Sequence, residues 1–230
     1  MKRVALTVAT LMASALITST IVAQPPDRPG GMGVDPAAFE APPLPQDDAE
    51  KKVLDAMEQM RQGPRYRNVS VSDGRLLRLL TETIGAKRVV EIGTSTGESA
   101  IWFALALRST GGHLYTHEID PGRAKIAEEN FKKAGLDDLV SVILGDAHET
   151  VKQHTEPIDI LFLDADKEGY IDYLDKLVPL IRPGGLIIAH NMNPRMADPR
   201  YMDAITKNPK METSFLLREG AGIGVTMKKR

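Results

Sequence analysis

The sequence contains no cysteine and carries almost no net charge, and both features limit what the protein can do. Without cysteine among its 230 residues, it has no disulfide bonds, thiolate metal sites or cysteine nucleophiles. The formal net charge of −2 argues against the basic surface of a nucleic-acid-binding protein and against a polybasic membrane face. A hydrophobic content of 42% and the absence of internal repeats predict one sizeable α/β core.

The amino terminus is of a different composition from the rest. Residues 1–23 begin with the basic MKR and continue as an uncharged apolar run, which predicts a secretory signal peptide with Ala23 last before cleavage. An uncleaved membrane anchor is the alternative, because the run is long enough to span a bilayer. We therefore expect an exported protein, periplasmic or secreted, or a membrane-anchored one. Residues 24–48 hold seven of the fifteen prolines and predict a disordered linker.

From residue 49 to residue 230, helical and extended patterns alternate, which predicts one globular domain. Helices are expected over 49–62, 70–86, 97–107 and 121–134, with Ser72 as the N-cap of the second and Gly85 past its end. Seven strands are expected over 87–93, 112–119, 139–144, 158–164, 185–190, 211–217 and 222–228, the fifth after a turn at 182–184. Strands separated by helices predict a mostly parallel sheet, whereas the short connection between the last two predicts an antiparallel hairpin.

The first strand runs through Glu91 into a glycine-containing loop and directly into a helix. Gly93 and Gly97 would let the backbone approach a ligand at the helix N-terminus. Ser95 and Glu98 stand where the dinucleotide fingerprint needs glycines, so a pyrophosphate site is not predicted. Glu91 favours a cationic ligand instead, such as the amino group and sulfonium of S-adenosylmethionine. A tight turn without a ligand is the alternative.

Acidic residues also end the next strands. Glu118 follows the second strand, where a carboxylate can accept both hydroxyls of a ribose, although a solvated loop position is the alternative. Asp146 and Ala147 follow the third, where an adenine edge would lie, but Asp146 can equally cap a helix.

The fourth and fifth strands end in side chains that can bind a metal. Asp164, Asp166 and Lys167 follow the fourth strand, and His190 and Asn191 end the fifth. Parallel strands bring these groups to one sheet edge, where carboxylate, imidazole and amide can hold a divalent ion. An ion pair satisfied within the cluster is the alternative for the two acids and the lysine.

The motifs VVEIGTSTGESA, HEIDP, GDA, LDADKEGY and GIGVTMK together resemble the cation-dependent O-methyltransferases of the catechol and caffeoyl-coenzyme A class. The segment SVSDGRLLRLL is similar to the helix by which that family reaches its methyl donor and substrate. The resemblance spans about residues 70–229. It implies a Rossmann-like methyltransferase fold of the α/β class, with a seven-stranded sheet, helices on both faces and a C-terminal antiparallel hairpin.

The resemblance also implies roles for individual residues. The methionine end of S-adenosylmethionine would be held by Glu91, Gly93, Ser95, Gly97 and Ser99, the ribose by Glu118, and the adenine by Asp146 and Ala147. Asp164 would be the first metal ligand and Lys167 the general base.

His190 departs from the family pattern, in which the metal pair after the fifth strand is Asp-Asn. A metal site made of Asp164, His190 and Asn191 would favour Mn²⁺, Co²⁺, Fe²⁺ or Zn²⁺ over Mg²⁺. A site that has lost its metal, or one that uses His190 as a base, are the alternatives. The segment between Asn191 and the last strand pair is short, which leaves little room for a substrate-gripping insertion.

We therefore expect metal-assisted methyl transfer from S-adenosylmethionine to a small ortho-dihydroxy aromatic compound. No nucleic-acid partner is expected, a membrane partner only if residues 1–23 are retained, and self-association as a homodimer is an open expectation. Three rival functions remain open. They are a nicotinamide-dependent oxidoreductase of the same fold class, a non-catalytic S-adenosylmethionine-binding module with a degenerate metal site, and a scaffold with a vestigial pocket.

Overall fold

The structure, a computed structural model, describes residues 41–63, 66–217 and 222–230. The predicted signal segment 1–23 and most of the predicted linker 24–48 lie outside these residues. Within the described part of the chain, no helix is both long enough and apolar enough to cross a membrane. The first helix, α1, begins at Asp48, where the Asp47 side chain accepts a hydrogen bond from the Glu50 backbone N–H.

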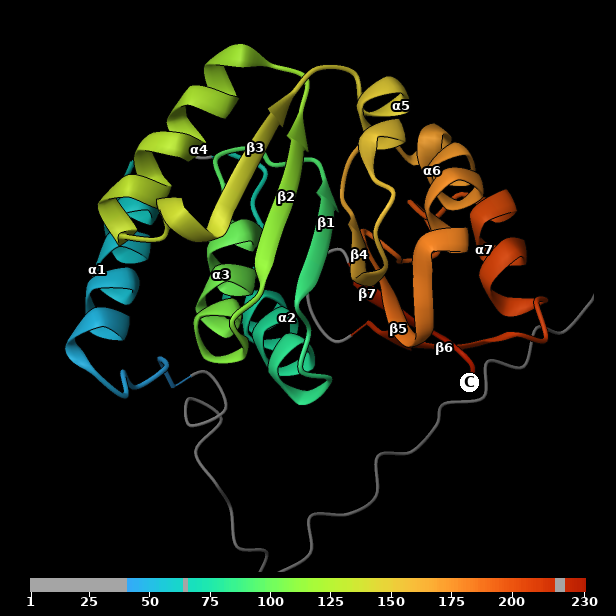
Figure 1. The fold of residues 1–230 in the computed structure, drawn as a ribbon, viewed down its shortest axis with the longest axis horizontal. Coiled ribbons are helices and arrows are strands. Elements are labelled where there is room, and N and C mark those ends of the chain that lie inside the picture. Colours follow the sequence, from blue (N-terminus) through green and yellow to red (C-terminus); the bar gives the residue numbers. More distant parts are fainter. Residues whose placement is uncertain (1–40, 64–65, 218–221) are drawn as a thin grey trace, which may run out of the picture. The chain divides into compact units, whose positions relative to one another are not determined.

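Seven strands form one sheet in the order β3-β2-β1-β4-β5-β7-β6 (Figure 1). The pairs from β3 to β5 are parallel, and β7 pairs antiparallel with both β5 and β6. The strands are β1 (Arg88–Ile92), β2 (His113–Glu118), β3 (Val140–Leu144), β4 (Ile158–Leu163), β5 (Ile181–His190), β6 (Met211–Leu216) and β7 (Ile223–Lys228). This topology confirms the predicted Rossmann-like sheet with its C-terminal hairpin.

Helices cover both faces of the sheet because neighbouring residues of each central strand point to opposite sides. Val89 of β1 belongs to one apolar core and Val90 to the other, and the same alternation holds for Ile160 and Leu161 of β4. The first core is completed by α1 (Asp48–Gln62), α2 (Val71–Thr83), α3 (Glu98–Thr110) and α4 (Pro121–Ala134). The second lies against α6 (Tyr170–Leu177) and α7 (Pro199–Thr206), with α5 (Ala147–Thr150) on the same side in Figure 1.

Two local predictions were wrong. The N-cap of α2 is Ser70 rather than Ser72, because the Ser70 hydroxyl accepts the Asp73 backbone N–H at 3.1 Å and the helix begins at Val71. The predicted turn at 182–184 is part of β5, which already pairs with β4 at Ile181. The register shifts before Leu186, so the Pro-Gly segment is accommodated as an irregularity within the strand rather than as its beginning.

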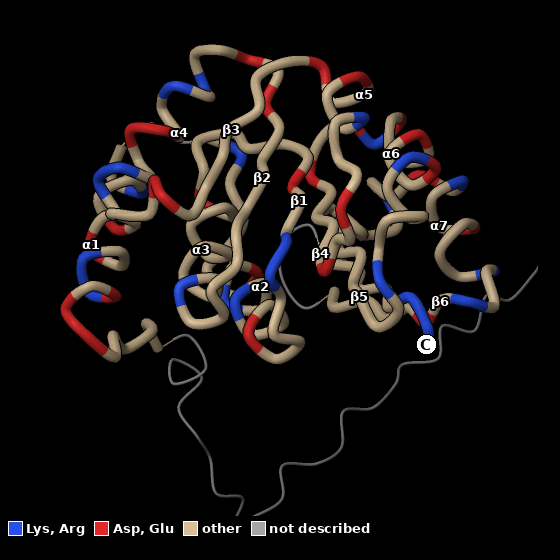
Figure 2. The backbone as a smooth tube through the Cα atoms, viewed as in Figure 1, with Lys and Arg blue, Asp and Glu red and all other residues tan. Residues whose placement is uncertain are grey.

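The strand order reverses between β1 and β4, so the helices that follow them, α3 and α6, lie on opposite faces of the sheet. In open α/β sheets this reversal is where ligands bind. Acidic positions occur toward the upper ends of β1 and β2 in Figure 2. By residue, β2 ends at Glu118, and Asp164 directly follows β4.

Candidate functional site

A cavity of about 550 Å³ opens at this reversal, and the loops after β1, β2, β3 and β4 contribute to its walls. Its volume falls within the range of small-molecule sites. The predicted cofactor residues that line it are Gly93, Ser95, Ser99, Glu118, Asp146 and Ala147. The fold thus brings together residues that the sequence separates by more than fifty positions.

Glu91 is fully buried at the end of β1 and adjoins the cavity through Ser99. The Ser99 hydroxyl donates to Glu91 Oε1 and the Thr116 hydroxyl donates to Oε2, both at 2.5 Å. Burial raises the pKa of Glu91 to about 8, despite these two hydrogen bonds, and the charges of Asp164 and Glu118 add to the rise. At neutral pH the carboxyl group is therefore mainly protonated, with a strong tendency to ionise if a cation is placed nearby.

The loop after β1 approaches the loop after β4 so closely that only glycine fits at position 93. Gly93 has a φ of +102°, and a Cβ there would lie 2.7 Å from the Asp164 carbonyl oxygen. Gly97, with a φ of +91°, is similarly confined by the ring of Phe131 and does not line the cavity itself. Ser95 has a φ of 50°, in a region that non-glycine residues rarely adopt. Such backbone strain is concentrated at ligand sites.

Glu118 connects the loop after β1 with the loop after β2. Its Oε2 accepts the Ser95 backbone N–H at 2.8 Å, and its Oε1 accepts the Asp120 N–H at 3.0 Å and an Arg123 N–H at 2.7 Å. These bonds hold the carboxylate at the cavity wall. Oε1 also accepts the Ile119 backbone N–H and a second N–H of Arg123, both at 3.1 Å, so it is fully used. Oε2 accepts only the Ser95 N–H and keeps one acceptor position, which the ribose predicted from the sequence could use.

Asp146 has the helix-capping role that was the alternative for this residue. Its side chain accepts the His148 backbone N–H at 2.9 Å at the start of α5, while Asp146 and Ala147 both line the cavity. The predicted adenine contacts of these two residues stay a prediction. On the same wall, His148 stacks on Tyr173 with ring centroids 4.7 Å apart, a flat surface that the sequence did not reveal.

Beyond Asp164 lies a chain of charged groups. His190 Nδ1 lies 3.1 Å from Asp164 Oδ2, and His190 Nε2 lies 3.3 Å from Asp73 Oδ2 of α2. Lys167 Nζ lies 3.5 Å from Asp164 Oδ1 and donates to the Tyr170 hydroxyl at 2.6 Å. Burial alone would lower the pKa of His190, but hydrogen bonds to Asp164 and Asp73 and their negative charges raise it to about 9. Burial lowers the pKa of Lys167, and the charge of Asp164 opposes that change.

The predicted metal set of Asp164, His190 and Asn191 does not fit a divalent ion in this arrangement. Both ring nitrogens of His190 face carboxylates, which only accept hydrogen bonds when ionised, so neither has a lone pair free for a metal. Across the residues that the structure describes, no group of three or more His, Asp or Glu side chains is arranged to hold an ion. The divalent metal predicted from the sequence is therefore not confirmed.

Asp73 is the main site residue that the sequence did not single out. It lies 117 positions before His190 and meets it only because α2 packs against α3, with Gly74 directly beside Trp102. A side chain at position 74 would overlap the indole, with Cβ 2.0 Å from the ring nitrogen. The motif SVSDGRLLRLL pointed to this helix, but no spacing rule links Asp73 to the end of β5.

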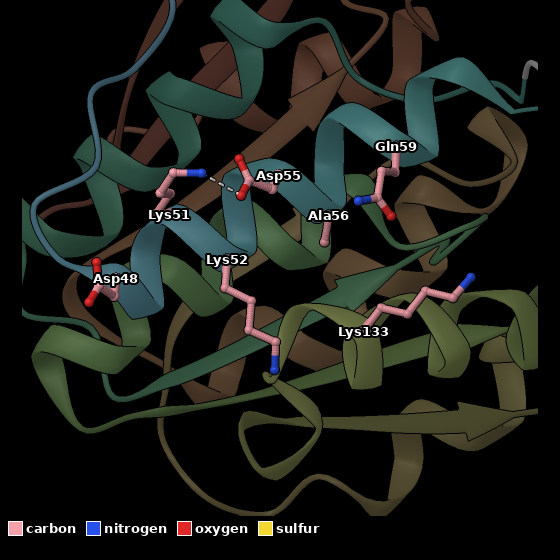
Figure 3. Close-up of a pocket in the computed structure, with 7 residues that line it drawn as sticks. All are labelled: Asp48, Lys51, Lys52, Asp55, Ala56, Gln59 and Lys133. Atoms are coloured by element: carbon pink, nitrogen blue, oxygen red, sulfur yellow. Dashed lines mark hydrogen bonds and ion pairs between the residues drawn. The ribbon is translucent and has the colours of Figure 1, made fainter.

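A second hollow, between α1 and α4, lacks these features (Figure 3). Its walls include Lys52 and Lys133, and Lys51 pairs with Asp55 along α1 at 2.7 Å. That pair is more than half exposed on both sides, as expected for a solvated helix surface of little energetic weight.

Comparison with known proteins agrees with the geometry. A family model described as O-methyltransferase matches residues 48–195. The chain belongs to this O-methyltransferase family. The match confirms the resemblance drawn from the motifs, and it supports neither the oxidoreductase alternative nor its cofactor.

Individual relatives within the family cover most of the domain. A catechol O-methyltransferase from Niastella koreensis is 37% identical over 149 residues, which are 63% of this chain and 66% of that protein. A catechol O-methyltransferase from Mycobacterium tuberculosis is 39% identical over 127 residues, 54% of this chain and 56% of that protein. The chain thus covers slightly less than two thirds of the first relative and just over half of the second.

Solved structures in the family extend the match. The O-methyltransferase from Bacillus cereus, determined in complex with SAH, has a TM-score of 0.67 and 30% identity, covering 81% of this chain and 93% of that one. An O-methyltransferase from Streptomyces achromogenes involved in tomaymycin synthesis, determined with SAM, has a TM-score of 0.68 and 25% identity, covering 84% and 95%.

Proposed function

We propose that this protein transfers a methyl group from S-adenosylmethionine to one hydroxyl of a small ortho-dihydroxy aromatic compound. The observation that carries the proposal is the position of the cavity. It joins the Gly93 loop and Glu118 on one side to Asp164 on the other, with Lys167 pairing to Asp164. The named activities of the Niastella and Mycobacterium relatives support the same substrate class.

The residues present fit S-adenosylmethionine. Gly93 and Ser95 form a close backbone cradle, and Glu118 presents carboxylate oxygens at the wall. The N-cap of α3, Gly97, has no side-chain hydrogen bond, so the first N–H groups of that helix are available to a carboxylate. When bound, S-adenosylmethionine would supply a methyl group carried on a sulfonium. The methyl group would pass to the substrate oxygen, and the electrons of the S–CH₃ bond would stay on sulfur.

Lys167 is the group that would take the proton. Its burial favours the neutral amine, and its hydrogen bond to Tyr170, whose own hydroxyl donates to the Leu163 carbonyl at 2.7 Å, fixes its position. The attacking hydroxyl would donate its proton to Lys167 Nζ as the new O–CH₃ bond forms. The neighbouring hydroxyl would donate to Asp164, whose Oδ1 lies 3.5 Å from the same nitrogen. Two adjacent oxygens can engage both groups, whereas two oxygens on opposite sides of a ring cannot.

The test is methyl transfer from isotopically labelled S-adenosylmethionine, followed by mass spectrometry of the product. Dihydroxybenzenes with ortho, meta and para hydroxyls are compared at equal concentration. We expect the ortho compound to be monomethylated with a kcat/KM at least about tenfold above the others, the effect of one lost hydrogen bond to a charged group. Equal rates for all three would remove the paired-oxygen recognition, and no labelled product from any would contradict the proposed function.

A further inference from the structure

The pairing of His190 with two carboxylates bears on what holds this site together. Asp164 comes from the end of β4, His190 from the end of β5 and Asp73 from the first turn of α2. The side chains are 16%, 9% and 14% exposed, so the cluster is largely removed from water. Two neighbouring carboxylates in such a place repel each other unless a cation lies between them.

The imidazole ring lies in that intermediate position. Its two nitrogens are within hydrogen-bonding distance of one carboxylate each, at 3.1 Å and 3.3 Å. Because ionised carboxylates cannot donate, both nitrogens must carry hydrogens, and the ring is a cation that donates at both ends. Lys167 provides the other basic group on Asp164.

We propose that His190 is the resident cation of this O-methyltransferase, and that its imidazolium replaces a divalent metal between Asp73 and Asp164. The imidazolium offsets one of the two carboxylate charges, and neither of its nitrogens has a lone pair with which to bind a divalent ion. His190 acts as a positioning residue. It orients Asp164 toward Lys167 and ties the start of α2 to the sheet.

This tie has a consequence for the cavity. The segment before α2 contributes Arg67, Asn68 and Val69 to the cavity wall. Asn68 is itself fixed by a hydrogen bond to the Thr96 hydroxyl at 3.0 Å. The link between His190 and Asp73 therefore holds one wall of the cavity against the edge of the sheet from which Asp164 projects.

The experiment measures Mn²⁺ binding by electron paramagnetic resonance, which reports the loss of the free-ion signal and needs no methyl transfer. The wild-type chain, the H190D and H190Q variants and an H113Q control are titrated without substrate. His113 lies at the opposite end of β2 and bonds to Ser141, so the control removes a histidine outside the cluster. We expect no stoichiometric binding by the wild type, H190Q or H113Q. H190D should bind one Mn²⁺ per chain, with a dissociation constant at least about tenfold below that of any weak binding by the wild type. The reason is that the imidazolium of His190 is replaced by a carboxylate, which can bind the ion through oxygen.

An activity measurement completes the test and rests on the proposed function. Methylation by the wild type and by H113Q should be unchanged by a chelator, H190Q should lose most activity with or without Mn²⁺, and H190D should recover activity only with Mn²⁺. Stoichiometric Mn²⁺ binding by the wild type would overturn the inference, whether or not H190Q also binds the ion. The wild-type titration alone decides this if H190D does not fold, and it does so even if no substrate is methylated.

Discussion

Binding of S-adenosylmethionine should release a proton from Glu91. This carboxyl group is fully buried, its pKa is raised to about 8 by burial, and it adjoins the cavity through its hydrogen bond with Ser99. At pH 7 a group with that pKa is about nine-tenths protonated. A cation bound above it favours the ionised form, so the proton should leave when the ligand arrives.

The size of the effect follows from Coulomb's law. A unit positive charge at roughly 5 Å, with an effective dielectric constant of about 20, stabilises the carboxylate by about 3 kcal/mol, or about 2 pKa units. The pKa in the complex would then be near 6, and about 0.8 of a proton would be released at pH 7. Because the free protein is protonated and the complex is ionised, affinity must increase with pH, by about twentyfold from pH 6.5 to 8.5.

Isothermal titration calorimetry in two buffers of different ionisation enthalpy measures the released protons directly. The Glu91→Gln variant is the matched control, since glutamine resembles the protonated carboxyl group but cannot ionise. It should bind without proton release and with a nearly flat pH dependence. Equal proton release by the wild type and by Glu91→Gln would refute the reasoning, and so would a wild-type affinity that does not change between pH 6.5 and 8.5.

Four further outcomes are expected. Lys167→Met should reduce kcat by about 10²–10⁴-fold with unchanged S-adenosylmethionine affinity, as for a lost general base, while Lys125→Met on the exposed face of α4 should leave both unchanged. Glu118→Ala should weaken S-adenosylmethionine binding by about 1.5–3 kcal/mol in calorimetry, with an unchanged circular dichroism spectrum; equal affinity would remove it from the ribose site. Burial and a neighbouring histidine lower the pKa of His117 to about 3, so its stabilising contribution is present above about pH 6.5 and lost as pH falls toward 3. The unfolding free-energy difference between wild type and His117→Gln should therefore shrink by about 1.4 kcal/mol per pH unit below pH 6, and a constant difference would contradict the shift. If residues 1–23 act as a cleaved signal peptide, N-terminal sequencing of the protein from its host should give Gln24 first, and a chain that retains residue 1 would favour the anchor.

The sheet could be predicted because its information is local. Apolar runs of five or six residues, each followed by an acidic or glycine-containing loop, defined the strands and placed Glu118, Asp146 and Asp164 at one edge. Parallel pairing then required those ends to lie together. The errors were local too. Ser70 and Ser72 can both cap a helix, and in the structure it is the Ser70 hydroxyl that accepts the Asp73 backbone N–H.

The charge state of the site could not be predicted from the sequence. Asp164, His190 and Lys167 could be recognised as neighbours, and their residue types suit a metal or an ion pair equally well. The distinction depends on how many acceptors face the imidazole. One carboxylate would leave a ring nitrogen available to a metal, whereas two require both nitrogens to donate. The second carboxylate, Asp73, comes from a helix at the other end of the domain sequence and meets His190 only after α2 has packed. The residue that decides between a metal site and an internal ion pair is therefore one that no motif around His190 contains.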